Sequence, residues 1–368
     1  MHIHLSFIRR LAFTCWVLFS LPVAAAPLDP SSSTWSMLGL LPSGDLVVDT
    51  GTSGDAGSLP TLTFAGGILV GDVVAQAGGP DIAVFRFDGG SVFGASDLLT
   101  VSSGSRALAL LFDGAALIEG TIDVSGGSGV DNSTTAGTGV AGGGNGGYGN
   151  WPTPGNGVGP GAGIGGSSSA SFSGVSSGSG GGFGTNGGNG GAGVTGKAGG
   201  SAYGDLATVL EGGSGGGAGG AGPYYTPGAG GGAGGGALEI GDLTDLDLAG
   251  ATILANGGDT GSSTAGNIGP NGGGGSGGGI LLHAFDVSMD LSTVVQANGG
   301  SGGVGAVQGG CGGAGRVRVV TNTEGSFTNN GTAEAVGGAG CQSGSLLATS
   351  QDDVGAGSAT PPTGVPAP

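Results

Sequence analysis

The residues GGSGVD at positions 126–131 match the first six positions of a calcium-binding nonapeptide. In that motif, backbone carbonyls and the aspartate carboxylate, here Asp131, supply the oxygen ligands that Ca²⁺ prefers. The match stops there, because Ser133 stands where a large apolar residue is expected and no tandem copy follows. Asp131 is therefore a candidate calcium ligand, with a plain turn as the alternative. No other cofactor is expected.

Two arginines, Arg316 and Arg318, alternate with valines and are expected to share one outward strand face. Enzymes that cleave acidic polysaccharides can use a basic residue beside carboxylates, and Asp286 or Asp290 could supply those carboxylates. A solvated charged edge is the favoured alternative, because a catalytic groove would show several charged and aromatic residues in each repeat. His283 is also expected to point outward, with no second ligand for a zinc site or partner for a triad. No catalytic residue is predicted.

Two cysteines, Cys311 and Cys341, lie in glycine-rich stretches on either side of the last clear repeat. In an exported chain, two such cysteines are candidates for one disulfide, which would close a loop and restrict the unfolded chain. Two free thiols remain the alternative, because the sequence does not show whether the two residues lie within bonding distance.

The first 25 residues are typical of a secretion signal. Arg9 and Arg10 precede an apolar run that ends in small residues suited to cleavage after Ala25. The run is too short to cross a membrane as a helix, so no membrane insertion of the mature chain is expected. The net charge of −18 argues against nucleic acid as a partner. The predicted location is extracellular or on the outer cell surface.

A unit of 21 or 22 residues occurs four times and closes each time on a small residue followed by two glycines. Its copies are residues 107–127, 237–258, 280–300 and 317–338. Within residues 237–258, apolar residues alternate in three short runs, which favours strands over helix. The unit thus predicts an all-β fold, a parallel β-helix or β-solenoid, in which repeats stack around a shared apolar column.

The stacking implies specific neighbours. Leu117, Leu248 and Leu291 are expected to line up in the column, and Asn256 and Asn298 to form a hydrogen-bonded ladder. Four unrelated hairpins are the alternative to stacked repeats.

Residues 45–103 carry less regular strand patterns and are expected to form early turns of the fold and a cap over its first end. Phe85, Phe87 and Phe93 are the predicted filling of that cap. Arg86 lies between two of these aromatic residues and is expected to reach solvent.

Residues 128–236 differ in kind, because glycine dominates and charge is almost absent. Glycine loses much backbone entropy on ordering, which favours disorder. The alternative is a set of extended polyglycine segments packed side by side on the β-solenoid. We favour this packing in a partly ordered form. Its predicted anchors are Trp151, Phe172, Phe183, Tyr224 and Tyr225. The shorter glycine-rich spacers should leave from the same corner of the repeat.

These patterns divide the chain into six parts. They are a signal peptide (1–25), a lead-in (26–44), an N-terminal cap with the first strands (45–127), a glycine-rich insertion (128–236), C-terminal repeats (237–350) and an exposed proline-rich tail (351–368).

Taken together, the stretches IAVFRFDGG and ALALLFDGAALIEGTIDVSGG, the glycine-rich insert, and ALEI…ILANGG, ILLHAFDV…VVQANGG and GGAGRVRVV resemble exported, glycine-rich bacterial repeat proteins that often carry a PEP-CTERM sorting tail. The resemblance covers most of the mature chain and rests on pattern and composition. It implies a structural role on the surface of, or in the medium around, bacteria that make exopolysaccharide. It provides no catalytic residues. Residues 365–368 resemble the start of the sorting signal, but the apolar helix and basic cluster do not follow.

The sequence therefore predicts a secreted or cell-surface structural protein without enzymatic activity. It would act as a matrix, adhesin-like or spacer protein, with extracellular polysaccharide or cell-surface components as partners. A polysaccharide lyase or hydrolase and a weak calcium-binding module are the alternatives.

Overall fold

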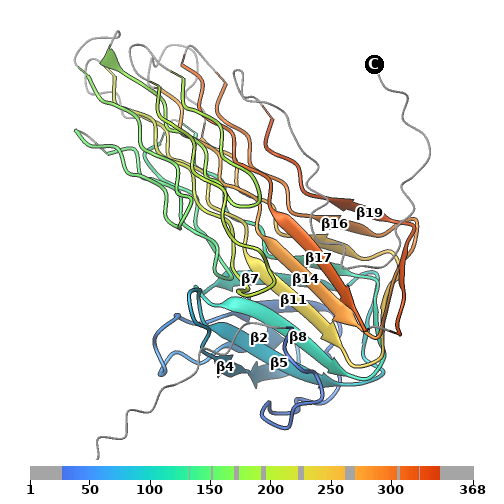
Figure 1. The fold of residues 1–368 in the computed structure, drawn as a ribbon. Helices are drawn as coiled ribbons and strands as arrows, with labels where there is room; N and C mark the ends of the chain where they lie inside the picture. The colour runs from blue at the N-terminus through green and yellow to red at the C-terminus, as the bar shows by residue number, and fades with distance from the viewer. Residues whose placement is uncertain are drawn as a thin grey trace, which may run out of the picture.

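The structure is a computed structural model. It describes residues 27–339 except for residues 132, 151, 170–173, 192–195, 223–227, 262–269, 305–306 and 323. The described residues contain nineteen β-strands and no α-helix, in agreement with the all-β prediction. The strands form three sheets, and the glycine-rich segments run away from them as a separate bundle (Figure 1).

The first sheet has six strands. Their order is β17 (Arg316–Thr321), β14 (Gly279–Ala284), β11 (Ala237–Asp242), β8 (Ala107–Asp113), β5 (Ile82–Asp88) and β4 (Asp72–Val74). Neighbouring strands are parallel except at β4, which pairs antiparallel with β5.

The second sheet has five parallel strands. Their order is β18 (Phe327–Asn329), β15 (Asp286–Met289), β12 (Asp245–Leu248), β9 (Ala116–Ile118) and β6 (Val92–Phe93).

The third sheet has eight strands. Their order is β19 (Thr332–Glu334), β16 (Val294–Gln296), β13 (Thr252–Leu254), β10 (Thr121–Asp123), β7 (Leu98–Ser103), β1 (Asp45–Asp49), β2 (Thr61–Phe64) and β3 (Gly67–Val70). The strands are parallel from β19 to β1, and β2 and β3 complete the edge as an antiparallel hairpin.

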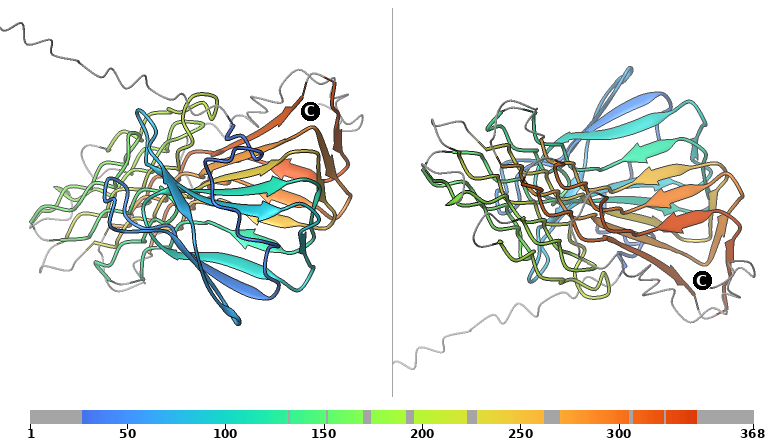
Figure 2. Two further views of the ribbon diagram at one scale, coloured as in Figure 1. Left: turned by 90° about the horizontal axis from the view of Figure 1, so that it is seen from below. Right: turned by 90° about the horizontal axis from the view of Figure 1, so that it is seen from above.

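Each of the four sequence repeats supplies one strand to each sheet, and the three sheets surround one apolar core (Figure 2). Side chains that alternate inward, such as Leu110, Ile240 and Leu282, follow one another in register across β8, β11 and β14. A single repeat could not bury these residues alone, so neighbouring repeats stabilise one another.

The predicted fold class, a parallel β-helix or β-solenoid, is wrong. The strands form three sheets of five to eight strands, and two of these sheets are mixed because β2, β3 and β4 pair antiparallel. The six-stranded sheet is also covered on both faces, whereas a simple solenoid leaves its outward side chains in solvent. Strands β5, β8, β11 and β14 are accordingly buried along nearly their whole length.

The predicted column of three leucines is also wrong. Leu248 pairs with Met289, Leu117 lies opposite Asp247, and Leu291 is 88% exposed in a turn. Leu291 thus lies two residues beyond Met289, in the turn before β16, which is one residue longer than the corresponding turn before β13.

The asparagine ladder and the burial of three predicted phenylalanines are found, although these phenylalanines lie on β5 and β6 in the main core. Phe85, Phe87 and Phe93 are buried, and the rings of Phe87 and Phe112 stack with their centroids 5.7 Å apart. The amide oxygen of Asn256 accepts the N–H of Asn298 at 2.8 Å, and Asn298 accepts the N–H of Val336 in the same way. The asparagine ladder thus links the closing turns of successive repeats.

The glycine-rich segments leave after β10, β13 and β16 and return to β11, β14 and β17. We call their described parts, within residues 124–236, 255–278 and 297–315, the glycine bundle. Backbone hydrogen bonds join its segments throughout, although the segments do not form β-strands. Of the aromatic residues predicted to anchor it, Phe183 is buried and packs on Tyr203, with ring centroids 4.9 Å apart. Trp151, Phe172, Tyr224 and Tyr225 lie outside the described residues.

Residues 229–236 show how the bundle is bonded. Successive N–H groups donate to three neighbouring segments in turn, so every third group meets the same neighbour. The N–H groups of residues 229, 232 and 235 donate to the carbonyls of Pro270, Gly273 and Ser276. Those of residues 230, 233 and 236 donate to Ser133, Gly127 and Val124, and those of residues 231 and 234 donate to Gly147 and Gly144. A repeat of three residues is that of the polyproline II helix, which has no internal hydrogen bonds and leaves its backbone groups free for such contacts.

Glycine is required in this arrangement because the segments touch through their backbones. A Cβ atom added to Gly216 would collide with the carbonyl oxygen of Gly273, and one added to Gly232 with that of Gly258. Glycine therefore permits the close approach that brings each N–H within reach of a neighbouring carbonyl. The entropy lost in ordering the segments is opposed by a nearly complete backbone hydrogen-bond network.

The bundle predicts a sharp difference between two glycine substitutions. Gly216→Ala should destabilise the protein by about 1–3 kcal/mol, because the new methyl group forces two segments apart. Gly337→Ala is the matched control, because its Cβ would lie 3.5 Å from the nearest atom, in ordinary van der Waals contact. It should change stability by less than about 0.5 kcal/mol. Denaturant unfolding measures both, and equal effects would contradict the packing described.

Candidate functional site

Among the described residues, three buried ionisable side chains, Arg86, Glu239 and His283, lie on the outward face of the six-stranded sheet. This face is covered by the segment of residues 27–35 and by the loop of residues 203–211, which follows the bundle segment containing Phe183. Apolar residues of the sheet and of these two segments form a second cluster, separate from the main core. It includes Leu28, Trp35, Val84, Leu111, Phe183, Leu206, Leu210 and Leu281. Ionisable residues on this face are therefore shielded from solvent.

His283 and Glu239 form a buried pair on this face. His283 Nε2 lies 2.8 Å from Glu239 Oε1, and the same oxygen accepts the N–H of Leu28 at 2.6 Å. The prediction that His283 points to solvent is wrong, because the covering segment leaves it only 7% exposed. Glu239 thus binds the covering chain and His283 together.

Arg86 performs a related task at the other side of the same segment. Its Nε donates to the carbonyl of Pro30 at 2.6 Å, and its Nη2 lies 2.6 Å from Asp113 Oδ2. The prediction that Arg86 reaches solvent is wrong, and the reason is again the covering segment, since only 7% of the residue is exposed. Glu239 and Arg86 together fasten residues 28–30 to the sheet.

Arg316 and Arg318 lie at the edge of this face on β17 and are partly buried. Glu211, on the covering loop, lies close enough to Arg316 to be influenced by its charge. Burial raises the pKa of Glu211 to about 7, with the negative charge of Asp205 acting in the same direction and Arg316 opposing it. Among the described residues, no carboxylate lies within ion-pair distance of either arginine.

The structure does not assemble the predicted grouping of these arginines with Asp286 or Asp290. Asp286 lies on β15 in the five-stranded sheet, where its Oδ1 accepts the N–H of Ser326 at 2.6 Å. Asp290 holds the turn that follows, through the N–H of Thr293. Both carboxylates support turns of a different sheet.

Asp131, the candidate calcium ligand, lines an open surface pocket of about 570 Å³. Asp259 and Ser301 line the same pocket, and Asp259 Oδ1 accepts the N–H of Ser301 at 2.6 Å. Two carboxylates from neighbouring bundle segments are thus brought together. Calcium requires six to eight oxygen ligands, so backbone carbonyls and water would complete the shell. The described residues contain no group of three or more His, Cys, Asp or Glu side chains suited to a metal ion.

The calcium hypothesis predicts a rise in melting temperature of about 2–4 °C at a calcium concentration ten times the dissociation constant. Asp131→Ala should abolish this rise, and Asp245→Ala, which removes an equal charge from an exposed position on β12, should leave it intact. Thermal scans at millimolar calcium, with magnesium for comparison, measure the shift. An equal rise in both variants would assign the effect to general screening of acidic charge.

The predicted disulfide involves one described cysteine. Cys311 lies in the bundle segment that returns to β17, whereas Cys341 lies outside the described residues. Their pairing therefore stays a prediction.

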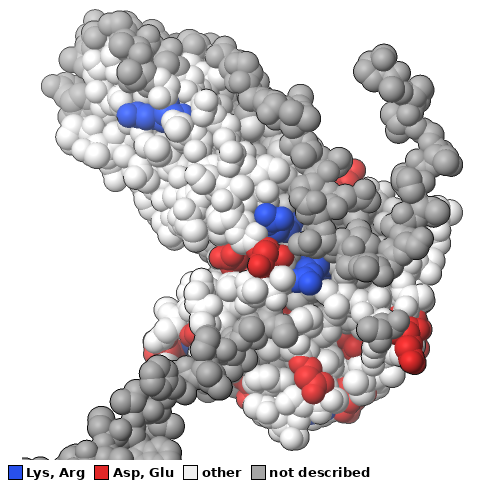
Figure 3. Space-filling model, in the orientation of Figure 1, with Lys and Arg blue, Asp and Glu red and all other residues white. Residues whose placement is uncertain are grey.

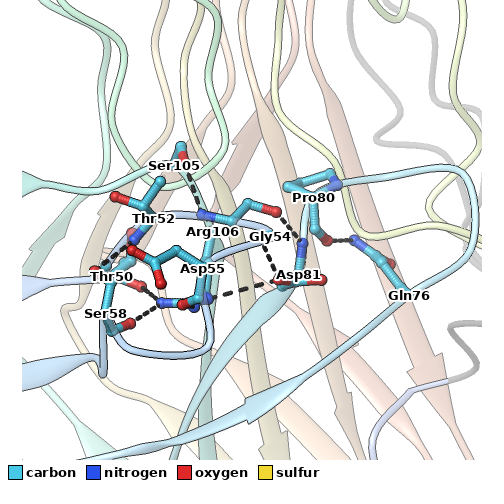
Figure 4. Close-up of polar contacts among 12 residues, drawn as sticks. Thr50, Thr52, Gly54, Asp55, Ser58, Gln76, Pro80, Asp81, Ser105 and Arg106 are labelled. Atoms are coloured by element: carbon cyan, nitrogen blue, oxygen red, sulfur yellow. Dashed lines mark hydrogen bonds and ion pairs between the residues drawn. The ribbon is translucent and has the colours of Figure 1, made fainter.

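Arg106 forms a centre that the sequence patterns did not reveal (Figure 4). Its side chain is fully buried and donates to main-chain carbonyls of the loop between β1 and β2. Nη1 donates to Thr50, at 3.2 Å, and to Ser58, and Nη2 donates to Asp55 at 2.6 Å. Gly51 adopts a φ of +70° beside the guanidinium, where a Cβ would meet Nη1. The only signal in the sequence is a lone cation directly before the apolar run of β8.

Asp81 lies beside this arginine. Its Oδ2 accepts the N–H of Gly54 at 2.7 Å and stands 3.8 Å from Arg106 Nε, an ion pair without a hydrogen bond. Arg106 Nε is buried and has no hydrogen-bond partner. Both residues line a pocket of about 760 Å³, which we call the Arg106 pocket. Its other lining residues are Ser36, Gly54, Ala56, Leu59, Val70, Gly71, Asp72, Val73 and Ala75.

One further carboxyl is buried at the corner between β11 and β12. Asp242 is 2% exposed, and its Oδ1 accepts the N–H of Thr244 at 2.7 Å, while Oδ2 has no hydrogen-bond partner. Burial raises the pKa of Asp242 to about 7, against the lowering effect of the hydrogen bonds from Thr244. The carboxyl group therefore binds a proton more tightly in the folded protein than in the unfolded chain.

This shift predicts a pH dependence of stability. Its contribution is fully present below the unfolded pKa near 3.8 and is lost as the pH rises towards the folded pKa of about 7. Asp242→Asn stays neutral, so it should melt about 2–4 °C above the wild type at pH 8 for each 1 kcal/mol gained. The advantage should vanish at pH 4. Melting curves across this range provide the test, and an advantage that is constant with pH would contradict the raised pKa.

Comparisons with models of known protein families, with curated proteins and with solved structures found no match to this chain. No helix among the described residues is long and apolar enough to cross a membrane.

Proposed function

We propose that this protein is an exported, non-enzymatic structural protein of the extracellular matrix or cell surface, associated with extracellular polysaccharide. The glycine bundle is the observation that carries this proposal. It consists of many chain segments that are held side by side by backbone hydrogen bonds and that extend away from the sheets (Figure 1). Such an array suits a rigid spacer or a contact surface, because its shape depends on few side chains.

The distribution of charge supports the same role. On the face shown in Figure 3, the bundle is nearly free of charged side chains, and acidic and basic groups gather over the sheets. An uncharged surface of backbone amides and small polar residues can form hydrogen bonds with sugar hydroxyls without a strong electrostatic preference. The acidic sheet body would keep the protein soluble outside the cell.

The buried ionisable groups have structural partners. Glu239 and His283 hold the covering segment, Arg86 joins Pro30 to Asp113, and Arg106 shapes a loop. Each of these groups is used to fix the position of the chain, which favours a structural role over a catalytic one.

The proposal predicts that the protein stays with the polysaccharide fraction of the cells that make it. Immunoblots of washed cells, extracted matrix and clarified medium measure its distribution. The control is a globular reporter exported by the same first 25 residues, which should appear in the medium. Enzymatic digestion of the polysaccharide should release the protein from the matrix fraction. A protein that is found in the medium in the same proportion as the reporter would overturn the proposal.

A further inference from the structure

We propose that the Arg106 pocket binds a sugar residue that carries a protonated amino group, as in a polymer of glucosamine. This inference rests on the proposed association with polysaccharide and names the class of sugar and the place where it binds. The pocket volume of about 760 Å³ lies within the range of small-molecule sites and exceeds the size of a single sugar ring.

The pocket has an apolar wall that is open to solvent. Leu59 is 54% exposed and Val70 is 49% exposed, and both line the opening together with Val73. Large apolar side chains grouped at the mouth of a pocket mark a contact surface. The hydrogen-bearing face of a pyranose ring is apolar and fits such a wall, while the hydroxyl and amino groups at the ring edge remain free for polar contacts.

The polar end of the pocket retains unused acceptor capacity. Asp81 Oδ2 is engaged by the N–H of Gly54, whereas Oδ1 accepts no hydrogen bond from the described residues. The neighbouring Arg106 does not consume this capacity, because Nε stands 3.8 Å from Oδ2 and its other nitrogens donate to main-chain carbonyls. Asp81 is also 20% exposed at its side chain, so a ligand can reach it.

Arg106 holds the polar end of the pocket in a fixed geometry. Its side chain is fully buried and its Nε has no hydrogen-bond partner, yet it lines the pocket. This nitrogen faces Asp81 Oδ2 at 3.8 Å, and the other guanidinium nitrogens donate to the carbonyls of the loop between β1 and β2, so the guanidinium is held rigidly beside the carboxylate. The buried guanidinium thus fixes the wall on which Asp81 stands, and Asp81 Oδ1 is the polar atom left for a ligand.

The negative charge of the pocket and of the whole chain favours an amino sugar over a neutral or acidic one. The pocket holds two carboxylates, Asp72 and Asp81, against the single guanidinium of Arg106. The whole chain carries a net charge of −18, so an acidic polysaccharide would be repelled at any approach. An ammonium group offers three donors and a positive charge to Asp81 Oδ1, and charge-assisted hydrogen bonds are stronger than neutral ones.

The experiment is isothermal titration calorimetry of the full mature chain at low ionic strength. The probes are a glucosamine tetramer, the N-acetylglucosamine tetramer of equal length and a galacturonate tetramer. We expect the glucosamine tetramer to bind, the acetylated one to bind much more weakly, and the galacturonate not to bind. Asp81→Asn keeps an acceptor for Gly54 and removes the charge, and it should weaken binding about ten-fold or more.

Two matched controls separate the pocket from general attraction of a cation to an acidic protein. Asp245→Asn removes the same charge from an exposed position on β12, and Leu291→Ala shortens an exposed leucine far from the pocket. Both should leave the affinity unchanged, whereas Leu59→Ala should reduce it. Equal losses in Asp245→Asn and Asp81→Asn, or equal binding of the acetylated tetramer, would overturn the inference.

The outcomes also distinguish this inference from the proposed function. A protein that stays in the matrix but binds no glucosamine tetramer would leave the structural role standing and remove the pocket assignment. A protein that binds the tetramer through Asp81 but diffuses freely into the medium would support the pocket assignment and overturn the proposed structural role.

Discussion

The structure depends on one constraint, which is that every buried backbone N–H and C=O group needs a partner. In the three sheets, parallel strand pairing meets this need, and the alternating side chains fill one core. In the glycine bundle the same need is met without strands, because inner segments such as residues 229–236 donate to three neighbours in turn. Glycine makes this possible, since a Cβ at positions such as Gly216 and Gly232 would collide with the backbone of a neighbouring segment.

The two parts support each other across the six-stranded sheet. Its inward face packs in the main core, and its outward face packs against Phe183, Leu206 and Leu210 from the glycine-rich chain. Glu239 and Arg86 on that outward face are consequently buried and bonded to Leu28 and Pro30 of the covering segment. The same covering layer therefore accounts for the positions of Glu239, His283 and Arg86 and for the raised pKa of Glu211.

The sequence predicted the all-β content, the repeats and the asparagine ladder, because each depends on short-range spacing that stacking repeats must preserve. It did not predict that residues 27–35 and 203–211 cover the six-stranded sheet, since neither segment has a periodic pattern that names its partner. His283 and Arg86 were misplaced for this reason. The Arg106 pocket was missed because its parts come from separate loops, and only the fold brings Asp81, Leu59 and Arg106 together.

The paired geometry of sheets and bundle has a consequence for how such a chain can change in length. Each repeat adds one strand to every sheet, and the chain between successive repeats runs out into the bundle and returns to the six-stranded sheet. Tandem duplication of an internal repeat would thus thicken both parts by one layer at once and leave the two outer surfaces as they are. Evolution could therefore lengthen this molecule by copying a single genetic module, without redesigning any interface.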